Sequence, residues 1–333
     1  MKRKVLATLL TTVMITTALV GCSEDKKGTE ADKKSELADG SEKEQSNEEA
    51  YEIGIVQLMQ HPALDAANEG FIKALDDAGV NYVADQQNAS GEAATNVTIA
   101  DKFVNDKKDL ILAIATSSAQ AAAGATEEIP ILGTAITDYE VAGLVESNDA
   151  PGGNLSGTSD MNPIEIQLGL IDEYCPDAKE LGVFYSSDED NSILQADMFE
   201  KAAELEGYTV ERFTISNSNE IEVVMQSMEG KVDAIYIPTD NKLAQGMPTV
   251  GMLAEEMLLP VFCGEGNMVK SGGFATYGLD YFALGYETGK MAVEILENGA
   301  DVSAMPIRFL PEDKFELIIN EEMAKVLGIT VTE

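Results

Sequence analysis

Two kinds of polar residue in this sequence could together hold a small zwitterion. Thr116, Ser117 and Ser118 precede a predicted helix, and hydroxyls with free N–H groups at a helix start form a cradle for one anion. Carboxylates can hold an ammonium group through charge-assisted hydrogen bonds. Helix capping is the alternative role for each of these residues singly. The aspartates expected near the same place are Asp138, Asp160, Asp240 and Asp280.

The other candidate ligand contacts also follow predicted strands. The carboxyl ends of parallel strands meet at one edge of a sheet, and open α/β sheets bind their ligands there. Polar residues in the segments 186–192, 239–241 and 264–266 stand at such ends. The candidates added on this ground are Gln57, His61, Glu189, Asn191, Ser192 and Asn241.

Composition excludes several classes of function. The chain has 22 Lys and Arg against 59 Asp and Glu, so it cannot build the cationic face that nucleic-acid binding needs. His61 is the single histidine, which rules out a metal site with several histidines. No Gly-x-Ser-x-Gly, Gly-x-x-x-x-Gly-Lys or Cys-x-x-Cys motif occurs. We therefore expect a binding protein and not an enzyme, with no cofactor and no metal.

Arginine is scarce, and this limits the charge of the ligand. Beyond the N-terminal leader the chain holds only Arg212 and Arg308, and neither falls at a predicted strand end. A helix start and hydroxyls can hold a single carboxylate, whereas a phosphate or a dicarboxylate usually needs a guanidinium.

The elements that must position these residues alternate between strand and helix. The segment 52–58 is predicted to be a buried strand, and Pro62 begins a helix that ends at Gly79. Apolar strands between amphipathic helices indicate a parallel sheet covered on both faces. The elements expected next are a strand over 80–84, a helix over 91–107 with Ala94, Val97, Ala100 and Val104 on one side, and a strand over 109–115.

The same pattern then recurs along the chain. The strand around Gly54 has a counterpart around Gly182, and the helix stop Gly79 has one at Gly207, both at an offset of 128 residues. The segments 109–116 and 129–131 have counterparts in 233–239 and 259–261. We therefore predict an α/β protein with two Rossmann-like lobes, each with a parallel sheet, around a ligand cleft.

Glycine-rich and polar segments suggest where the chain passes between the lobes. One crossing is expected at 151–157, with three glycines, and another near 278–281. On this basis residues 51–157 and about 281–305 form lobe 1, and residues 158–280 form lobe 2. The C-terminal segment 306–333 contains a predicted strand, 315–319, and a predicted helix, 321–327, whose lobe the sequence leaves open.

The N-terminus resembles the leader of a bacterial lipoprotein. Lys2, Arg3 and Lys4 precede an apolar stretch that ends in Leu-Val-Gly-Cys at Cys22. We expect residues 1–21 to be a signal peptide, Cys22 to carry the lipid, and residues 22–50 to be a disordered tether. The body would then be extracytoplasmic and held at the bacterial membrane by lipid. A plain secretory signal with a chance cysteine is the alternative.

Several motifs of the body resemble a known family. The segments IGIVQ (53–57) and HPALD (61–65) look like the opening of a family of ABC-transporter substrate-binding lipoproteins, which includes binders of tryptophan and related aromatic amino acids. The resemblance extends from residue 52 to about 328 in the family's order and implies a type I periplasmic-binding fold. The other motifs are GLVES (143–147), PGGN (151–154), E-x-NS (189–192), VDAIYIPTDN (232–241) and DY (280–281).

The resemblance implies a receptor that passes an amino acid, expected to be tryptophan or phenylalanine, to a membrane permease driven by a separate cytoplasmic ATPase. A nucleoside or sugar ligand is an alternative within the same fold, with Tyr139, Tyr185 and Tyr281 as stacking faces. A ligand-sensing lipoprotein without a transport role is another.

Overall fold

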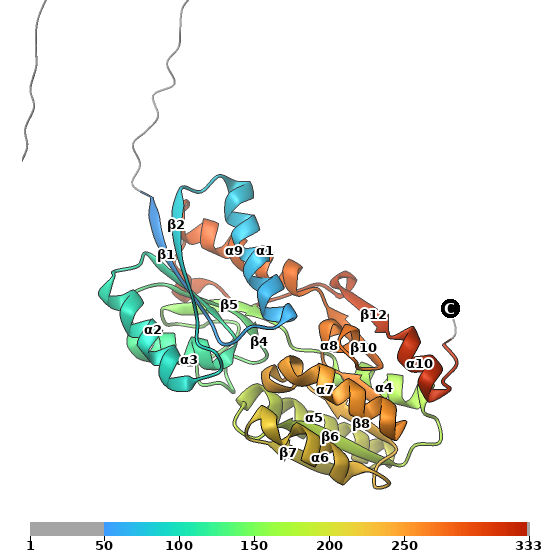
Figure 1. Cartoon of the computed structure of the whole chain (residues 1–333). Coiled ribbons are helices and arrows are strands. Elements are labelled where there is room, and N and C mark those ends of the chain that lie inside the picture. Colours follow the sequence, from blue (N-terminus) through green and yellow to red (C-terminus); the bar gives the residue numbers. More distant parts are fainter. Residues whose placement is uncertain (1–49, 332–333) are drawn as a thin grey trace, which may run out of the picture. The chain divides into compact units, whose positions relative to one another are not determined.

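With two exceptions, strands and helices alternate over residues 50–331, which are the residues that the computed structural model describes (Figure 1). The first part of the chain forms β1 (Tyr51–Gln57), α1 (Pro62–Ala78), β2 (Tyr82–Asn88), α2 (Ala93–Asn105), β3 (Leu110–Ile114), α3 (Thr116–Ala125), β4 (Ile131–Ile136) and β5 (Leu155–Ser159). The middle part forms α4 (Ile164–Tyr174), β6 (Glu180–Ser186), α5 (Asp190–Glu206), β7 (Thr209–Ile215), α6 (Ile221–Met228), β8 (Ala234–Ile237), α7 (Asn241–Met257), β9 (Val261–Cys263), α8 (Gly266–Lys270) and β10 (Ala275–Leu279). The last part forms α9 (Tyr281–Leu296), β11 (Arg308–Phe309), β12 (Phe315–Ile319) and α10 (Glu321–Leu327). The exceptions are β4 and β5, and β11 and β12, which follow one another without an α-helix between them. The predicted signal peptide, tether and lipidated Cys22 lie outside the described residues.

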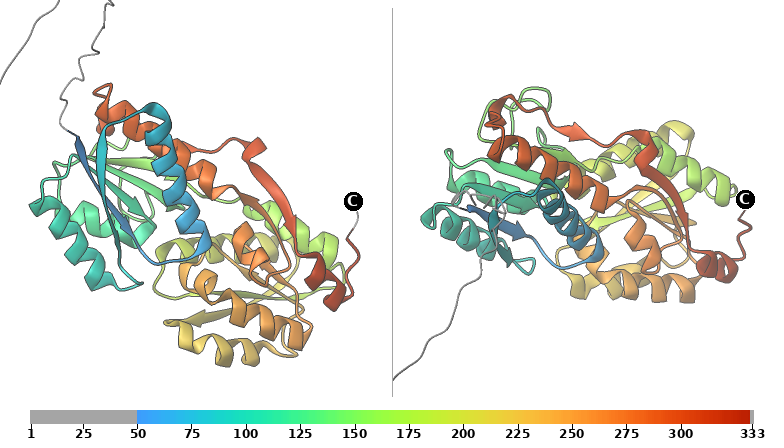
Figure 2. Two further views of the ribbon diagram at one scale, coloured as in Figure 1. Left: turned by 45° about the horizontal axis from the view of Figure 1, so that its top comes forward. Right: turned by 90° about the horizontal axis from the view of Figure 1, so that it is seen from above.

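The strands form two six-stranded sheets, and each sheet with its helices is one lobe. Lobe 1 has the strand order β11-β5-β4-β3-β1-β2, and lobe 2 has the order β12-β10-β9-β8-β6-β7. All neighbouring strands are parallel except β12, which runs antiparallel to β10. The predicted fold class is therefore confirmed. Helices cover both faces of each sheet, as the views in Figure 2 show.

The two lobes repeat one another strand by strand. For five of the six strands, replacing β1, β2, β3, β4 and β5 by β6, β7, β8, β9 and β10 converts the first order into the second; the sixth strands, β11 and β12, differ in direction relative to their neighbours. Both α1 and α5 have 17 residues and end at a left-handed glycine, Gly79 with φ 72° and Gly207 with φ 95°. The offset of 128 residues that the sequence shows is thus a repeat of whole strand–helix units.

Strand β3 shows why the apolar runs of this chain are central strands. All five of its residues are buried. Leu110, Leu112 and Ile114 pack with α1 and α9 on one face of the sheet, and Ile111 and Ala113 pack with α2 and α3 on the other. A strand that is covered on both faces needs apolar side chains in both directions, and β3 has them.

The buried face of α2 differs from the prediction. The helix lies where it is expected, but Val97 is 50% exposed and the buried residues are Asn96, Ile99, Ala100 and Phe103. The pattern of apolar residues predicted the wrong face because a polar residue, Asn96, occupies the middle of the buried face. Its Oδ1 accepts a hydrogen bond from Ser118 Oγ at 3.0 Å, which ties α2 to the first turn of α3.

Helices α1 and α9 pack unusually closely because glycines line the seam between them. A Cβ atom on Gly285 would lie 1.8 Å from the carbonyl oxygen of Ala67, and one on Gly70 would lie 2.1 Å from that of Phe282. Neither position can accept a side chain at the present separation of the helices. The seam anchors α1, and the residue before α1 is His61.

The chain passes between the lobes three times, after β5, after β10 and after β11. The crossings are bonded to one another: Tyr281 Oη donates to Asp160 Oδ2 at 2.7 Å, and the Asp280 N–H donates to the Lys314 carbonyl at 3.2 Å. The segment 306–333, whose lobe the sequence leaves open, is divided. It gives β11 to lobe 1 and β12 and α10 to lobe 2.

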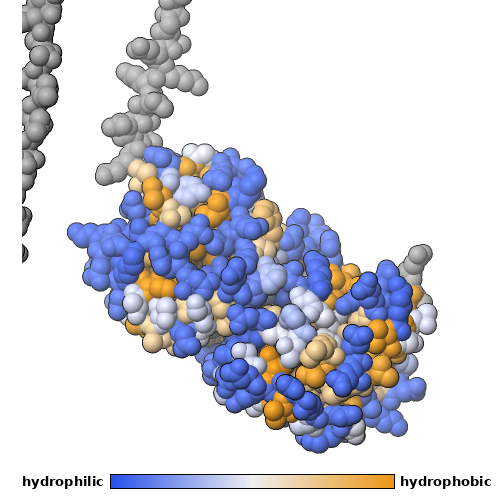
Figure 3. Space-filling view, in the orientation of Figure 1, coloured by the Kyte–Doolittle hydropathy of each residue, from blue (hydrophilic) through white to orange (hydrophobic). Residues whose placement is uncertain are grey.

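Hydrophilic residues cover most of the face shown in Figure 3. No helix within residues 50–331 combines the length and the apolar character needed to cross a membrane. Cys175 and Cys263 are free thiols, and Cys263 is fully buried in the core of lobe 2.

Candidate functional site

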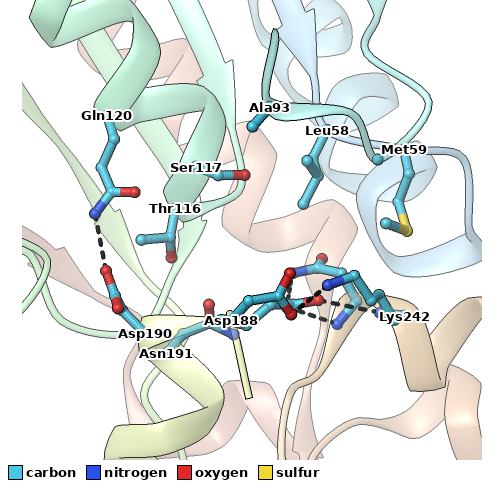
Figure 4. A pocket seen from close by; sticks show the side chains of 13 residues that line it. Leu58, Met59, Ala93, Thr116, Ser117, Gln120, Asp188, Asp190, Asn191 and Lys242 are labelled. Atoms are coloured by element: carbon cyan, nitrogen blue, oxygen red, sulfur yellow. Dashed lines mark hydrogen bonds and ion pairs between the residues drawn. The ribbon is translucent and has the colours of Figure 1, made fainter. Parts of the chain in front are cut away.

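A cavity of about 100 Å³ lies where strand ends of lobe 1 face strand ends of lobe 2. Figure 4 shows Thr116, Ser117 and Gln120 of α3 on one side of it and Leu58 and Met59 on another. Lobe 2 closes the cavity from below. It contributes Asp188, Glu189, Asp190 and Asn191 from the start of α5, and Asn241 and Lys242 from the start of α7.

The start of α3 offers hydrogen-bond donors to the cavity. No side chain caps this helix, and the hydroxyl oxygen of Thr116 is buried without a hydrogen-bond partner. Thr116 is 5% exposed, so that oxygen cannot turn to bulk water. Ala115, directly before it, has φ 83°, a strained conformation that sets the direction in which the chain enters the helix. An uncapped helix start with a spare hydroxyl has donors that could hold one anionic group.

The β1–α1 loop provides the apolar wall of the cavity. Leu58 and Met59 are its large apolar lining residues. Gln57 holds this loop in place, because its Nε2 donates to the Met59 carbonyl at 2.8 Å and to Asp65 Oδ1 at 2.7 Å. Gln57 is therefore a positioning residue, and it does not line the cavity.

Lobe 2 presents mainly acidic groups to the cavity. Glu189 accepts hydrogen bonds from the Asn241 N–H at 3.1 Å and from Asn241 Nδ2 at 2.7 Å. Burial, together with the neighbouring charge of Asp240, raises the pKa of Glu189 to about 8. The one cation among the lining residues is Lys242, and its amine already pairs with Asp188. A cation from outside would therefore be stabilised here.

A second, water-sized cavity of about 10 Å³ lies against Asp160, Asp240, Glu265 and His61. Burial raises the pKa of all three carboxyl groups, that of Glu265 to about 7. Each carboxylate already has donors within the protein. Asp160 accepts from Thr137 and Tyr281, Asp240 from Ser186 and the Leu243 N–H, and Glu265 from the N–H groups of Asn267 and Met268.

Hydrogen bonds join the lobes around these cavities. His61 Nε2 lies 3.1 Å from Asn241 Oδ1, and Gln120 Nε2 donates to Asp190 Oδ2 at 3.0 Å. Gln195 of α5 also donates to the Thr137 hydroxyl, after β4, at 3.1 Å. These bonds hold the lobes closed over the cavity.

The structure brings most of the candidate residues together and leaves others aside. Contact with a ligand stays a prediction for all of them. Those that line the larger cavity are Thr116, Ser117, Glu189, Asn191 and Asn241, and those that line the smaller one are His61, Asp160, Asp240 and again Asn241.

Four candidates have structural roles outside the cavities. Gln57 holds the β1–α1 loop, and Ser192 is fully buried behind Asp240, to which its hydroxyl is hydrogen-bonded. Asp138 accepts from the Val141 N–H in a turn. Asp280 is exposed and caps α9 through the N–H groups of Phe282 and Ala283. Asp240 lines the smaller cavity and also has a structural role, because it caps α7.

Sequence reasoning missed Leu58, Met59, Gln120 and Lys242. Gln120 could have been predicted from the sequence, because it lies one helical turn after Thr116 and so on the same face of α3. Leu58 and Met59 carry no polar group, so nothing in the sequence marked them as candidate ligand contacts. Within residues 50–331 no group of three or more His, Cys, Asp or Glu is arranged to hold a metal ion.

Comparison with known proteins supports one family. The family described as "ABC transporter substrate binding protein" matches residues 52–333. A tyrosine-binding protein of Clostridioides difficile (strain R20291) is 44% identical over 331 residues, which is 98% of this chain and 93% of that protein. Leucine-binding and glucose-galactose-binding proteins share the fold at 14% and 15% identity.

Two solved structures of similar proteins differ in how well they superpose on this chain. A domain from Streptococcus pneumonia in complex with L-Trp has a TM-score of 0.82 at 37% identity, covering 86% of this chain and 97% of its own. A ligand-free, open structure of a substrate binding protein with adhesive properties from Clostridium difficile has a TM-score of 0.67 at 44% identity, covering 85% and 97%. The less similar sequence gives the better superposition, so the lobes here are arranged more as in the complex than as in the open form.

Proposed function

The chain belongs to the ABC transporter substrate binding proteins, and from that premise we propose that it captures an aromatic amino acid by closing its two lobes. The proposal depends mainly on one observation. The uncapped start of α3, with the unpartnered Thr116 hydroxyl, faces an acid-rich surface on the opposite lobe. The first suits an α-carboxylate and the second an α-ammonium group. Only a closed structure offers both to one small molecule.

The aromatic side chain is supported by two independent points. Leu58 and Met59 form an apolar wall, and a methionine sulfur makes favourable contacts with aromatic rings. One relative is a tyrosine-binding protein, and another relative has been solved in complex with L-Trp. An acidic side chain would lie beside Asp188, Glu189 and Asp190, so the cavity disfavours an acidic ligand.

A nucleoside or sugar ligand is less well supported. Such ligands usually stack on aromatic faces, and Tyr139, Tyr185 and Tyr281 were the candidates. Tyr139 and Tyr185 pack inside the cores of lobes 1 and 2, and the Tyr281 hydroxyl is bonded to Asp160. None of the residues that line the larger cavity is aromatic.

The wider role that we propose is uptake. The protein would pass its ligand to a membrane permease whose ATPase is a separate chain, without catalysing a reaction. A lipid on Cys22 would hold it at the outer face of the cell membrane, with residues 22–50 as the tether.

Tryptophan fluorescence provides the test, because the chain has ten Tyr and no Trp. Emission from the free protein is therefore tyrosine emission. We expect added L-tryptophan to give a blue-shifted indole signal that saturates, since the closed lobes would exclude water from the ring. L-Tyrosine and L-phenylalanine should compete with it in calorimetry. If none of the three binds while a nucleoside or a sugar raises the melting temperature, the proposal is wrong.

Removing the hydroxyls at the start of α3 should weaken binding. For Thr116→Val and Ser117→Ala we expect a rise in Kd of roughly tenfold each, because each change would remove one hydrogen bond to the ligand carboxylate. Calorimetry with L-tyrosine measures this. Tyramine, which lacks the carboxylate, should lose no affinity in either variant. Ser227→Ala, on the exposed side of α6, is the matched control. Equal losses for tyrosine and tyramine would remove α3 from the carboxylate site.

A further inference from the structure

His61 carries a buried nitrogen whose role the fold leaves open. The side chain is 6% exposed, and its Nδ1 atom has no hydrogen-bond partner. It follows Leu58 and Met59 in the β1–α1 loop, which forms the apolar wall of the cavity. The other ring nitrogen, Nε2, makes the bond to Asn241 across the lobes.

The neighbours of His61 determine which of its nitrogens carries the proton. Asn241 Nδ2 donates to Glu189 Oε2 at 2.7 Å, and the same oxygen accepts from the Asn241 N–H at 3.1 Å, so Oε2 acts as an acceptor and the amide of Asn241 turns its nitrogen toward it. Its Oδ1 then faces His61 Nε2 at 3.1 Å and requires a hydrogen on that nitrogen. Burial lowers the pKa of His61 and outweighs the raising effects of Asn241 and Asp65, so the ring is neutral at pH 7. A neutral ring with its hydrogen on Nε2 leaves Nδ1 as an acceptor.

An acceptor that is buried without a donor is costly, so a bound ligand that supplied the donor would be favoured. This step depends on the proposed function. With the ligand carboxylate at the start of α3, its side chain would lie along the wall formed by Leu58 and Met59. Asn241 lines this cavity and also the smaller cavity that His61 lines, so the edge of the ring would reach His61 past Asn241. Tyrosine and tryptophan carry a polar hydrogen at the edge of the ring, whereas phenylalanine has none.

We propose that His61 Nδ1 accepts a hydrogen bond from the phenol O–H or indole N–H of the ligand, and so selects tyrosine and tryptophan over phenylalanine. Glu189 and Asn241 act through His61 as positioning residues. They hold its acceptor toward the ligand only when the lobes are closed, because Asn241 is in lobe 2 and His61 in lobe 1. Ligand selection and lobe closure are thereby linked in one chain of hydrogen bonds.

The first test compares ligands on the unaltered protein. We expect L-tyrosine to bind roughly tenfold or more tightly than L-phenylalanine, and L-tryptophan more tightly than its 1-methyl derivative by a similar factor. Both pairs differ in the polar hydrogen of the ring. Equal affinity within both pairs would overturn the inference while leaving the proposed function intact. Failure of every aromatic amino acid to bind would refute the proposed function itself.

The second test uses His61→Gln, whose amide nitrogen can replace Nε2 as the donor to Asn241 but provides nothing at the place of Nδ1. We expect the tyrosine-to-phenylalanine ratio of affinities to fall to about one, with phenylalanine affinity nearly unchanged. Gln245→Ala is the control, because it removes another contact between the lobes, to the Gln60 carbonyl, and should leave the ratio as it is. Equal losses for tyrosine and phenylalanine in His61→Gln would show that His61 meets the common part of the ligand and would overturn the inference. The ligand comparison decides the matter alone if the variant does not fold.

Discussion

Replacing Gly285 with alanine should destabilise the protein by about 3 kcal/mol or more. The new Cβ would lie 1.8 Å from the carbonyl oxygen of Ala67, and a backbone atom cannot move aside as a flexible side chain can. Helices α1 and α9 must then separate, and the packing of Phe71 and Leu284 between them and the sheet is lost. Urea unfolding followed by circular dichroism measures the change in the free energy of unfolding.

The matched control for this prediction is Gly169→Ala in α4, where a Cβ would meet nothing within 4 Å. There we expect no loss, or a gain of up to about 1 kcal/mol, because alanine favours a helix more than glycine does. Similar destabilisation by both substitutions would mean that helix propensity, and not the close seam, explains the effect. Gly285→Ala should also weaken ligand binding, because α1 carries His61 at its start.

The ligand-free protein should lose stability as the pH rises from about 5 to 8. Burial raises the pKa of Glu189 to about 8 and that of Glu265 to about 7, from values near 4.5 in an unfolded chain. The folded state therefore binds more protons than the unfolded state in this window, and each added pH unit favours unfolding. Below the unfolded values both states are protonated and the penalty vanishes. We expect a total loss on the order of 2–4 kcal/mol, or roughly 5–15 °C in melting temperature.

Glu189→Gln should flatten this pH dependence, because the amide oxygen can still accept from Asn241 but the side chain cannot ionise. Differential scanning calorimetry from pH 5 to 8 measures it. Glu211→Gln, at an exposed position of β7, is the control and should follow the unaltered protein. A melting temperature that stays constant or rises from pH 5 to 8 would contradict the prediction. Bound amino acid should stabilise more at pH 8 than at pH 5, because its ammonium compensates the ionised carboxylates.

The sequence predicts much of the fold because its strands are buried on both faces. Apolar segments such as 110–114 are stable only at the centre of a sheet that is covered on both faces. Such segments recur along the chain at an offset of about 128 residues, which reveals the repeat. The face of α2 was mispredicted because Asn96 is buried as a hydrogen-bond acceptor for Ser118. Periodicity treats a polar residue as exposed and takes no account of a hydroxyl on another helix that donates to its amide oxygen.

The candidate site was predictable only in part for a related reason. The rule that sites gather at strand ends selected Thr116, Glu189 and Asn241, which the structure brings together around one cavity. It could not separate Asp280, which caps an exposed helix start, from residues that face the cavity. Capping and ligand binding use the same residue types at the same places, and only the three-dimensional arrangement tells them apart.

The three bonded crossings between the lobes have a consequence for the entropy of binding. A single strand between two bodies would let them bend and twist independently. Here Asp160 is bonded to Tyr281 and Asp280 to Lys314, so the crossings must move together. We therefore expect the lobes to open mainly by rotation about the row of crossings, so that the open ensemble explores few angular coordinates. Closure therefore gives up little rotational freedom, and more of the interaction energy of the ligand remains as affinity.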